Sequence, residues 1–216
     1  MKNRVLHALV SLAAALAATA ATGELAGTGR GSKGEAVPDA VVSLVPLDAA
    51  VAPAPAATAN AEIGQKGQEF TSYVTVVQTG SRVVFPNQDN VQHHVYSLSK
   101  AKKFELPLYN PGQAESFVFD VPGLVTLGCN IHDWMLAYLV IVPTPYFAKT
   151  DAQGAAVVVA PPGRYRLELW HPRLAAVQSE EIALADGTPA KRDFTVTLKP
   201  DRRIRRGPES KAGSYR

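Results

Sequence analysis

Residues 128–142 read G-C-N-I-H-D-W-M-L-A-Y-L-V-I-V, a polar turn that leads straight into an apolar, β-branched run. Helical periodicity is nearly absent after the first 21 residues, and glycine and proline separate the apolar segments. Runs of the same short, alternating or β-branched kind recur along the chain at 41–45, 73–77, 82–85, 94–98, 116–119, 155–159, 165–170 and 194–198. This spacing predicts an all-β sandwich.

The polar turn contains three candidate metal ligands, Cys129, His132 and Met135, at the spacing C-x-x-H-x-x-M. Thiolate, imidazole and thioether suit copper, and two histidines, a cysteine and a weak axial methionine make up a blue-copper site. A strand that ends at Cys129 and turns at once can return His132 and Met135 to one point. Coincidental core residues are the alternative, and for this lone cysteine so are burial and intermolecular pairing.

The second histidine must come from another segment, and residues 87–94, N-Q-D-N-V-Q-H-H, are the plausible source. His7 lies in the N-terminal apolar segment, while His171 has no other ligand type beside it and is interpreted as a half-buried histidine at a strand end. Because successive strand residues point to opposite faces, only one of His93 and His94 can face Cys129.

Residues 83–97, V-V-F-P-N-Q-D-N-V-Q-H-H-V-Y-S, resemble the first-ligand region of the amicyanin and plastocyanin type of cupredoxin. Amicyanins also have the compact C-x-x-H-x-x-M loop, and the likeness covers about residues 60–143. The chain is also similar to the bacterial cupredoxin-like proteins labelled methylamine utilisation proteins. The resemblance implies a Greek-key cupredoxin β-sandwich with one mononuclear type 1 copper ion, whose ligands would be His93, Cys129, His132 and Met135.

The resemblance favours His93 over its neighbour, because His93 stands six residues after Asn87, the spacing of the family's ligand histidine. The chain departs from the family at Gln92, where amicyanins have proline, at His94, where asparagine is usual, and at Asp133, which replaces a proline. Copper binding is still expected. The hydrogen bonding around the thiolate, and with it the redox potential, is left open.

Two outer segments resemble a second module. Residues 34–44 look like the opening of a carboxypeptidase-regulatory-like, prealbumin-type β-sandwich, and residues 150–154 with 161–167 look like its later half. We therefore predict that the cupredoxin domain, 60–143, is inserted in this small sandwich, 24–48 plus 145–198, so that 41–44 pairs with strands over a hundred residues later. The alternative is a cupredoxin with decorated termini, since both motifs are largely turn chemistry.

The N-terminal segment of the chain predicts export. Lys2 and Arg4 precede an alanine- and leucine-rich run that ends in A-T-A at 18–20, which is typical of a cleaved signal peptide, residues 1–21, and predicts a periplasmic protein. A membrane anchor is the alternative, but the run is short for a span, and no later stretch is long and apolar enough to be one. Residues 49–59 form an alanine and proline linker or exposed loop.

Charge is unevenly distributed. The net charge of +3 includes the two basic residues of the signal and a net +5 in the tail at 199–216, which leaves −4 for the body of the chain. This does not suggest a nucleic-acid partner. The tail is expected to be disordered, and either contacts an acidic partner or anionic membrane surface or is simply solvated.

These residues favour a non-enzymatic carrier of single electrons between redox protein partners, because a site with one geometry for both copper states reorganises little. No hydrolytic or oxygenase centre is visible. The resemblance implies that electrons leave through the ring edge of His132, with Trp134 as an apolar docking surface. The rival function is a copper carrier or sensor that delivers the ion itself. A purely adhesive sandwich would leave the ligand cluster unexplained.

Overall fold

The computed structural model describes residues 22–48 and 60–201, and within them every regular element is a β-strand. The expected signal peptide, the linker at 49–59 and the tail from residue 202 onward lie outside the described residues. The described part of the chain holds no helix with the length and apolar character of a membrane span. The predicted all-β class is confirmed.

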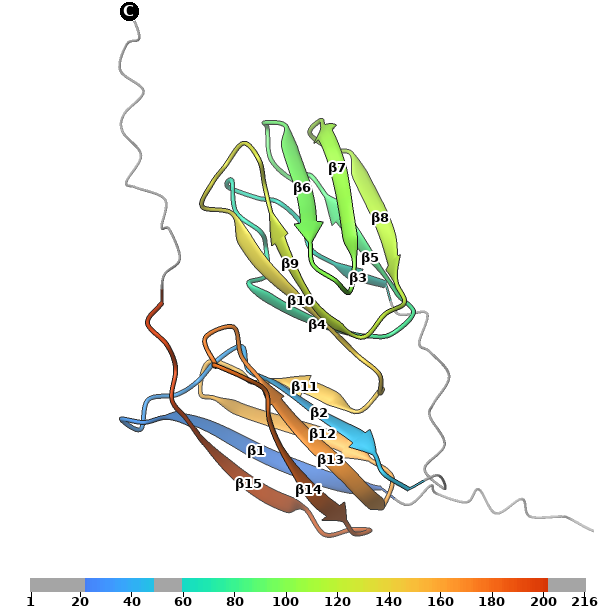
Figure 1. The fold of residues 1–216 in the computed structure, drawn as a ribbon, viewed down its shortest axis with the longest axis vertical. Coiled ribbons are helices and arrows are strands. Elements are labelled where there is room, and N and C mark those ends of the chain that lie inside the picture. Colours follow the sequence, from blue (N-terminus) through green and yellow to red (C-terminus); the bar gives the residue numbers. More distant parts are fainter. Residues whose placement is uncertain (1–21, 49–59, 202–216) are drawn as a thin grey trace, which may run out of the picture.

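The lower half of the molecule, which we call the outer sandwich, contains strands from both ends of the chain (Figure 1). Its three-stranded sheet has the order β12-β1-β15, and its four-stranded sheet has the order β11-β2-β13-β14. The strands are β1 (Gly23–Gly31), β2 (Val41–Pro46), β11 (Phe147–Lys149), β12 (Ala155–Ala160), β13 (Gly163–Trp170), β14 (Gln178–Leu184) and β15 (Ala190–Val196).

The upper half, the inner sandwich, is built from the continuous segment between β2 and β11 (Figure 1). A five-stranded sheet, β4-β10-β9-β6-β7, faces a three-stranded sheet, β3-β5-β8. The strands are β3 (Asn60–Glu62), β4 (Val74–Gln78), β5 (Ser81–Pro86), β6 (His93–Leu98), β7 (Lys103–Tyr109), β8 (Ala114–Phe119), β9 (Gly123–Gly128) and β10 (Leu136–Val142).

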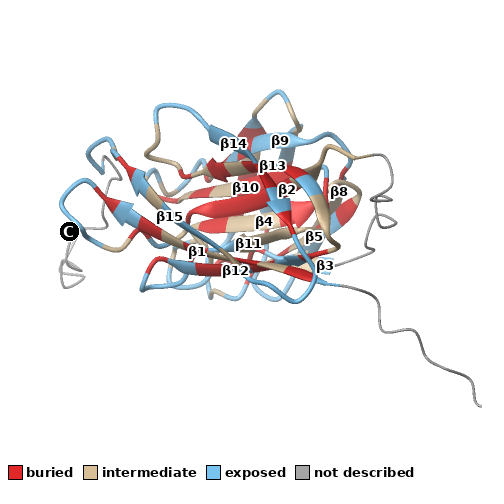
Figure 2. Cartoon of the chain, turned by 90° about the horizontal axis from the view of Figure 1, so that it is seen from below, coloured by how far each residue is buried: buried red, intermediate tan, exposed pale blue. Residues whose placement is uncertain are grey.

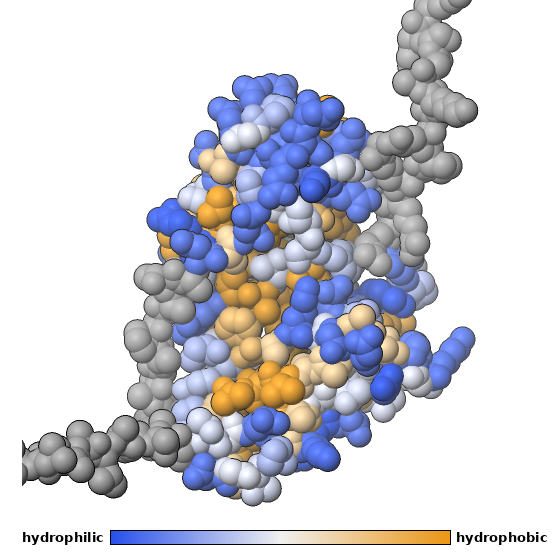
Figure 3. Space-filling view, turned by 180° about the vertical axis from the view of Figure 1, so that it is seen from behind, coloured by the Kyte–Doolittle hydropathy of each residue, from blue (hydrophilic) through white to orange (hydrophobic). Residues whose placement is uncertain are grey.

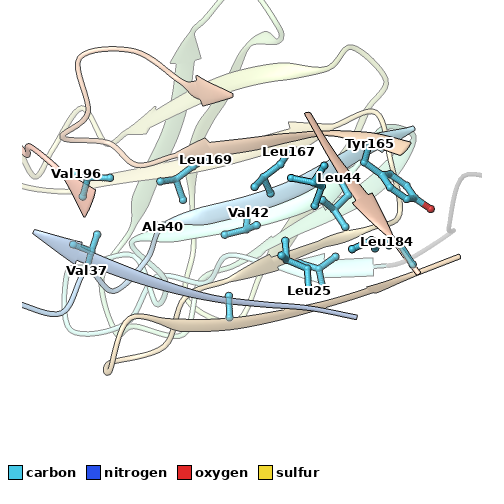
Figure 4. Close-up of a cluster of buried hydrophobic side chains, with 14 residues drawn as sticks. Leu25, Val37, Ala40, Val42, Leu44, Tyr165, Leu167, Leu169, Leu184 and Val196 are labelled. Carbon is cyan, nitrogen blue, oxygen red and sulfur yellow. The ribbon is translucent and has the colours of Figure 1, made fainter. Parts of the chain in front are cut away.

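Pairing between β2 and β13 closes the outer sandwich around the inserted one, with Val41 opposite Trp170 and Leu44 opposite Leu167. Alternate residues of β13 are buried, so that Leu167 and Leu169 point into the same core as Leu44. Figure 4 shows these side chains between the two sheets. Period-two alternation in the sequence therefore decides which face of the strand is buried.

Strand β1 was not among the predicted runs, because four of its nine residues are glycine and its sequence lacks a β-branched run. Tertiary contacts explain both the strand and its glycines. β1 lies between β12 and β15, and a Cβ on Gly27 would lie 2.9 Å from the Phe194 ring. The glycine thus permits an approach that a larger residue would prevent.

The two sandwiches share an apolar contact. Val140 and Val142 of β10 form a cluster with Val41, and the rings of Tyr138 and Trp170 meet edge to face at 5.7 Å. Figure 2 shows the buried stretches of β10 and β2, and Figure 3 shows apolar side chains across the middle of the molecule. Lys149 adds a polar link at this boundary, since its ammonium group donates to the Val74 carbonyl at 2.9 Å.

The first residue of the predicted tail contacts the outer sandwich. The Lys199 N–H donates to the Arg173 carbonyl at 2.9 Å, and Arg173 Nε donates to the Lys199 carbonyl at 2.6 Å. The first contact joins two backbone groups, and the second joins the Arg173 guanidinium to a backbone carbonyl.

Candidate metal centre

The loop between β9 and β10 is closed at its base. Gly128, the last residue of β9, pairs with Leu136, the first of β10, so residues 129–135 form a compact loop between the two strands. Inside it, the Met135 N–H donates to the His132 carbonyl at 2.9 Å. A Cβ on Gly128 would lie 2.9 Å from the Tyr96 ring, which explains why the residue before Cys129 is a glycine.

Three of the four expected ligands have their donor atoms together. Cys129 Sγ lies 3.6 Å from His132 Nδ1 and 3.9 Å from His93 Nδ1, and one ligand atom from each residue lies within 4.8 Å of the others. Metal–nitrogen and metal–sulfur bonds of about 2.0–2.3 Å in a trigonal plane would separate the donor atoms by roughly 3.5–4 Å. The spacing of these side chains therefore fits one mononuclear ion.

Burial of the centre is one-sided. His93 is fully buried, Cys129 is 5% exposed and Met135 is 3% exposed, whereas His132 is only partly buried. Met135, in the same loop as Cys129 and His132, is thus enclosed directly before β10. The ring of His132 also lies against Trp134, with centroids 5.4 Å apart. The centre is shielded on the His93 side and reaches the surface on the His132 side.

The two adjacent histidines turn to opposite sides of β6. His93 points toward Cys129, while His94 Nε2 contacts the Glu105 carboxylate at 2.9 Å and its ring lies 5.9 Å from that of Tyr96. His171 also lies apart from this group: it directly follows β13 of the outer sandwich, is buried, and accepts the Arg173 N–H on Nδ1. The pleat of the strand is sufficient to separate His93 from His94.

Asp89 is a functional candidate that the sequence reasoning missed. Its Oδ2 lies 2.7 Å from His93 Nε2 and 2.8 Å from the Gln68 N–H, and its Oδ1 accepts the Gly67 N–H. Such a carboxylate fixes the tautomer of a ligand histidine, leaving the Nδ1 lone pair toward Cys129. The available signal was the acid four residues before His93, although that spacing alone does not predict a contact in a loop.

Electrostatics keep Asp89 ionised. Burial raises its pKa, but the Gln68 N–H, the His93 ring and the Gly67 N–H together outweigh burial and hold the pKa below the ordinary value of 3.8. The carboxylate is thus available as a negative acceptor behind the buried ligand histidine.

A second set of buried hydrogen bonds supports the segments that lead to His93. Tyr109 OH donates to the Gln65 side chain, and Asn87 Nδ2 donates to the carbonyls of Tyr109 and Val91. Burial raises the pKa of Tyr109 well above its ordinary value, the Gln65 hydrogen bond opposes that rise, and negative charge at Cys129 adds to it. Tyr109 therefore stays neutral as a donor beneath the centre.

No protein-family model matches the chain, and no curated protein matches it. Similar solved structures include a purple cupredoxin from Nitrosopumilus maritimus, 22% identical with a TM-score of 0.35, covering 38% of this chain and 99% of that one. Amicyanin from Paracoccus versutus is 19% identical with a TM-score of 0.35, covering 46% of this chain and 91% of its own.

A copper-containing nitrite reductase from Thermus scotoductus is 23% identical with a TM-score of 0.38, and the match covers 45% of this chain but only 27% of the reductase. These TM-scores are too low to support a function. The functional argument rests instead on the side chains of the centre itself.

Proposed function

We propose that the inner sandwich is a cupredoxin-type domain that holds one mononuclear copper ion and carries single electrons between redox protein partners, without being an enzyme. The observation that carries this proposal is the convergence of His93 Nδ1, Cys129 Sγ and His132 Nδ1, with separations of 3.6 and 3.9 Å from the sulfur. A thiolate between two imidazoles is a donor set that copper prefers.

Each residue has a distinct role in this proposal. Cys129 would hold the ion as its strongest donor, His93 and His132 would supply nitrogen donors, and Met135 would supply a weak thioether donor. When bound, copper provides the one-electron couple between Cu(II) and Cu(I). The chain's contribution is to hold its ligands in one arrangement: Asp89 orients His93 from behind, and the pairing of β9 with β10 fixes the loop that carries the other three.

The partly exposed edge of His132 is the proposed route for the electron. Trp134 lies beside it, and Ile131 in the same loop is 46% exposed. A partner that covers this surface would approach the centre without exposing His93 or Cys129 to water. A centre with one partly exposed ligand and the others shielded suits electron exchange better than release of an ion, because release would have to break the bonds to the buried His93 and Cys129 side chains.

A titration with Cu(II) tests the proposal. The wild-type protein should develop intense thiolate-to-copper absorption at one equivalent and should cycle reversibly between Cu(II) and Cu(I) with unchanged metal content. Cys129→Ser should lose this absorption while its far-UV circular dichroism is retained. A colourless wild type with no bound metal would refute the proposal, and loss of copper on each reduction would favour a carrier that delivers the ion.

We further propose that residues 24–48 and 145–198 form a carboxypeptidase-regulatory-like sandwich around the copper domain, 60–143, and that residues 1–21 direct export to the periplasm. The three- and four-stranded sheets of the outer sandwich support the first statement, and the sequence pattern of the N-terminus supports the second. N-terminal sequencing of protein released from the periplasm should begin near residue 22, and retention of Met1 would contradict export by cleavage.

A further inference from the structure

A tight hairpin turn lies beside the metal centre. Lys66 and Glu69 exchange two backbone hydrogen bonds, and Gly67 and Gln68 between them both have positive φ, 65° and 58°. Two left-handed residues in a two-residue hairpin loop are the signature of a type I′ turn. Glycine is usual at the second central position, so Gln68 occupies a conformation that its own side chain disfavours.

The turn contacts both sides of the centre through its backbone. The N–H groups of Gly67 and Gln68 both donate to the Asp89 carboxylate, which contacts the buried His93. The Gln68 carbonyl accepts the indole N–H of Trp134 at 2.8 Å, and Trp134 lies against the partly exposed His132. Gln68 is thus the residue at which the hydrogen bonds from the two sides meet.

We propose that the turn at Gly67 and Gln68 is a positioning element that couples the two ligand histidines. It holds Asp89 behind His93 and Trp134 beside His132 as one hydrogen-bonded unit, so that contact with Trp134 at the surface changes the support of the buried ligand. This inference rests on the proposed copper site for its effect on the metal. The hydrogen bonds that connect Asp89 to Trp134 through the turn do not need a bound metal ion, so this coupling can be measured in the metal-free protein.

The metal-free protein provides the first test. The chain has two tryptophans, Trp134 and Trp170, whose indole N–H signals can be resolved by nuclear magnetic resonance in nitrogen-labelled protein. Asp89→Asn should shift the Trp134 signal and leave that of Trp170, which lies at the boundary of the sandwiches, unchanged. Asp120→Asn, at an exposed carboxylate, is the control and should move neither. An unmoved Trp134 signal in Asp89→Asn would overturn the inference.

The copper-loaded protein provides the second test, a double-mutant cycle on the ratio of Cu(II) to Cu(I) affinity. Asp89→Asn should lower that ratio about tenfold, because a lost second partner makes His93 a weaker donor to the more charged ion. Trp134→Phe, which keeps a ring beside His132 but removes the hydrogen bond to Gln68, should lower it by a smaller factor, and only when Asp89 is present. An equal factor in both backgrounds would show that the two sides are independent and would overturn the coupling.

A third variant separates the backbone of the turn from its side chain. Gln68→Gly keeps the N–H and carbonyl and suits positive φ, so both the Trp134 signal and the affinity ratio should stay as in the wild type. If Gln68→Gly abolishes the response of Trp134 to Asp89→Asn, the side chain carries the coupling and the proposed role of the turn is wrong. A chain that binds no copper but shows the Trp134 response would refute the proposed function and retain the coupling.

Discussion

The inner and outer sandwiches have similar architecture but arrange their buried polar side chains differently. The outer sandwich has an apolar cluster that includes Leu25, Leu44 and Leu167 between its sheets (Figure 4). Its buried Thr150 hydroxyl is satisfied by the backbone of Val37 and Ala40. The inner sandwich instead buries several polar side chains at one end, and the donor atoms of three residues converge there. Those convergent groups are His93, Cys129 and His132.

This difference distinguishes buried polar groups that stabilise the fold from buried polar groups that could bind a ligand. A buried polar group costs free energy unless it is hydrogen-bonded, so a cluster that is retained needs partners. At Thr150 the partners are the chain's own backbone groups, which is a structural role. At the centre the partners, such as Asp89 behind His93, leave donor atoms facing one another. The following variants test whether the two sandwiches divide in this way.

Replacement of the ligand histidine should have the largest effect. His93→Ala removes one nitrogen donor and leaves Asp89 without its partner, so it should abolish the copper absorption completely. His94→Asn is the matched control, since the neighbouring ring points away from Cys129 toward Glu105. It should retain both copper and colour in the same titration. The reverse result would mean that the strand presents its other face to the centre.

A core substitution in the outer sandwich should affect stability and spare the centre. Leu167 is 1% exposed, and Leu167→Ala should lower the free energy of unfolding by about 2–5 kcal/mol through lost apolar contact and the cavity left behind. Urea unfolding followed by circular dichroism measures the loss. The copper absorption per folded molecule should stay unchanged, and bleaching before unfolding would show that the two sandwiches are not independent in this respect.

The all-β fold could be predicted because its signals are local. Alternating runs such as 165–170 and the apolar run at 136–142 lie within the observed β13 and β10. Six observed strands lie outside the predicted runs: β1, β3, β7, β9, β11 and β14. In β1 the glycines and in β7 Pro107 weaken the local pattern, and pairing with neighbouring strands decides their conformation.

The centre was predictable only in part for the same reason. The spacing of Cys129, His132 and Met135 is visible within one loop. The two-residue period of a strand shows only that one of His93 and His94 can face Cys129, and the spacing from Asn87 in the resemblance favours His93. Asp89 depends on a hairpin turn some twenty residues earlier, and Trp134 donates to that turn's carbonyl across 66 positions. Contacts of this kind are set by tertiary folding and have no local pattern.

Removal of the axial candidate should have a smaller effect than removal of a histidine. Met135→Leu keeps a side chain of similar volume at a site that is 3% exposed, so the fold should be retained. Copper should remain bound through the other ligands, and the reduction potential should rise because a lost weak donor disfavours Cu(II). Voltammetry of the wild type and the variant measures the change. An unchanged potential would remove Met135 from the metal site.

The smallest effect is expected at an ion pair of the outer sandwich, where charge should affect stability alone. Asp48 accepts the Arg164 backbone N–H at 2.9 Å and the Arg164 guanidinium at 3.0 and 3.1 Å, and these contacts hold the Asp48 pKa below its ordinary value of 3.8. A carboxyl with a depressed folded-state pKa stabilises the fold above its unfolded-state pKa and loses that contribution as the pH falls through the folded-state value.

Asp48→Asn should therefore lower the Tm slightly at neutral pH, since an exposed pair contributes little, and the difference from the wild type should shrink well below pH 3.8. Thermal melts across this range measure the trend, with the copper absorption at neutral pH as the control. A difference that persists undiminished in acid would assign the effect to the hydrogen-bond geometry at Arg164, because the amide and the protonated acid would then not be equivalent.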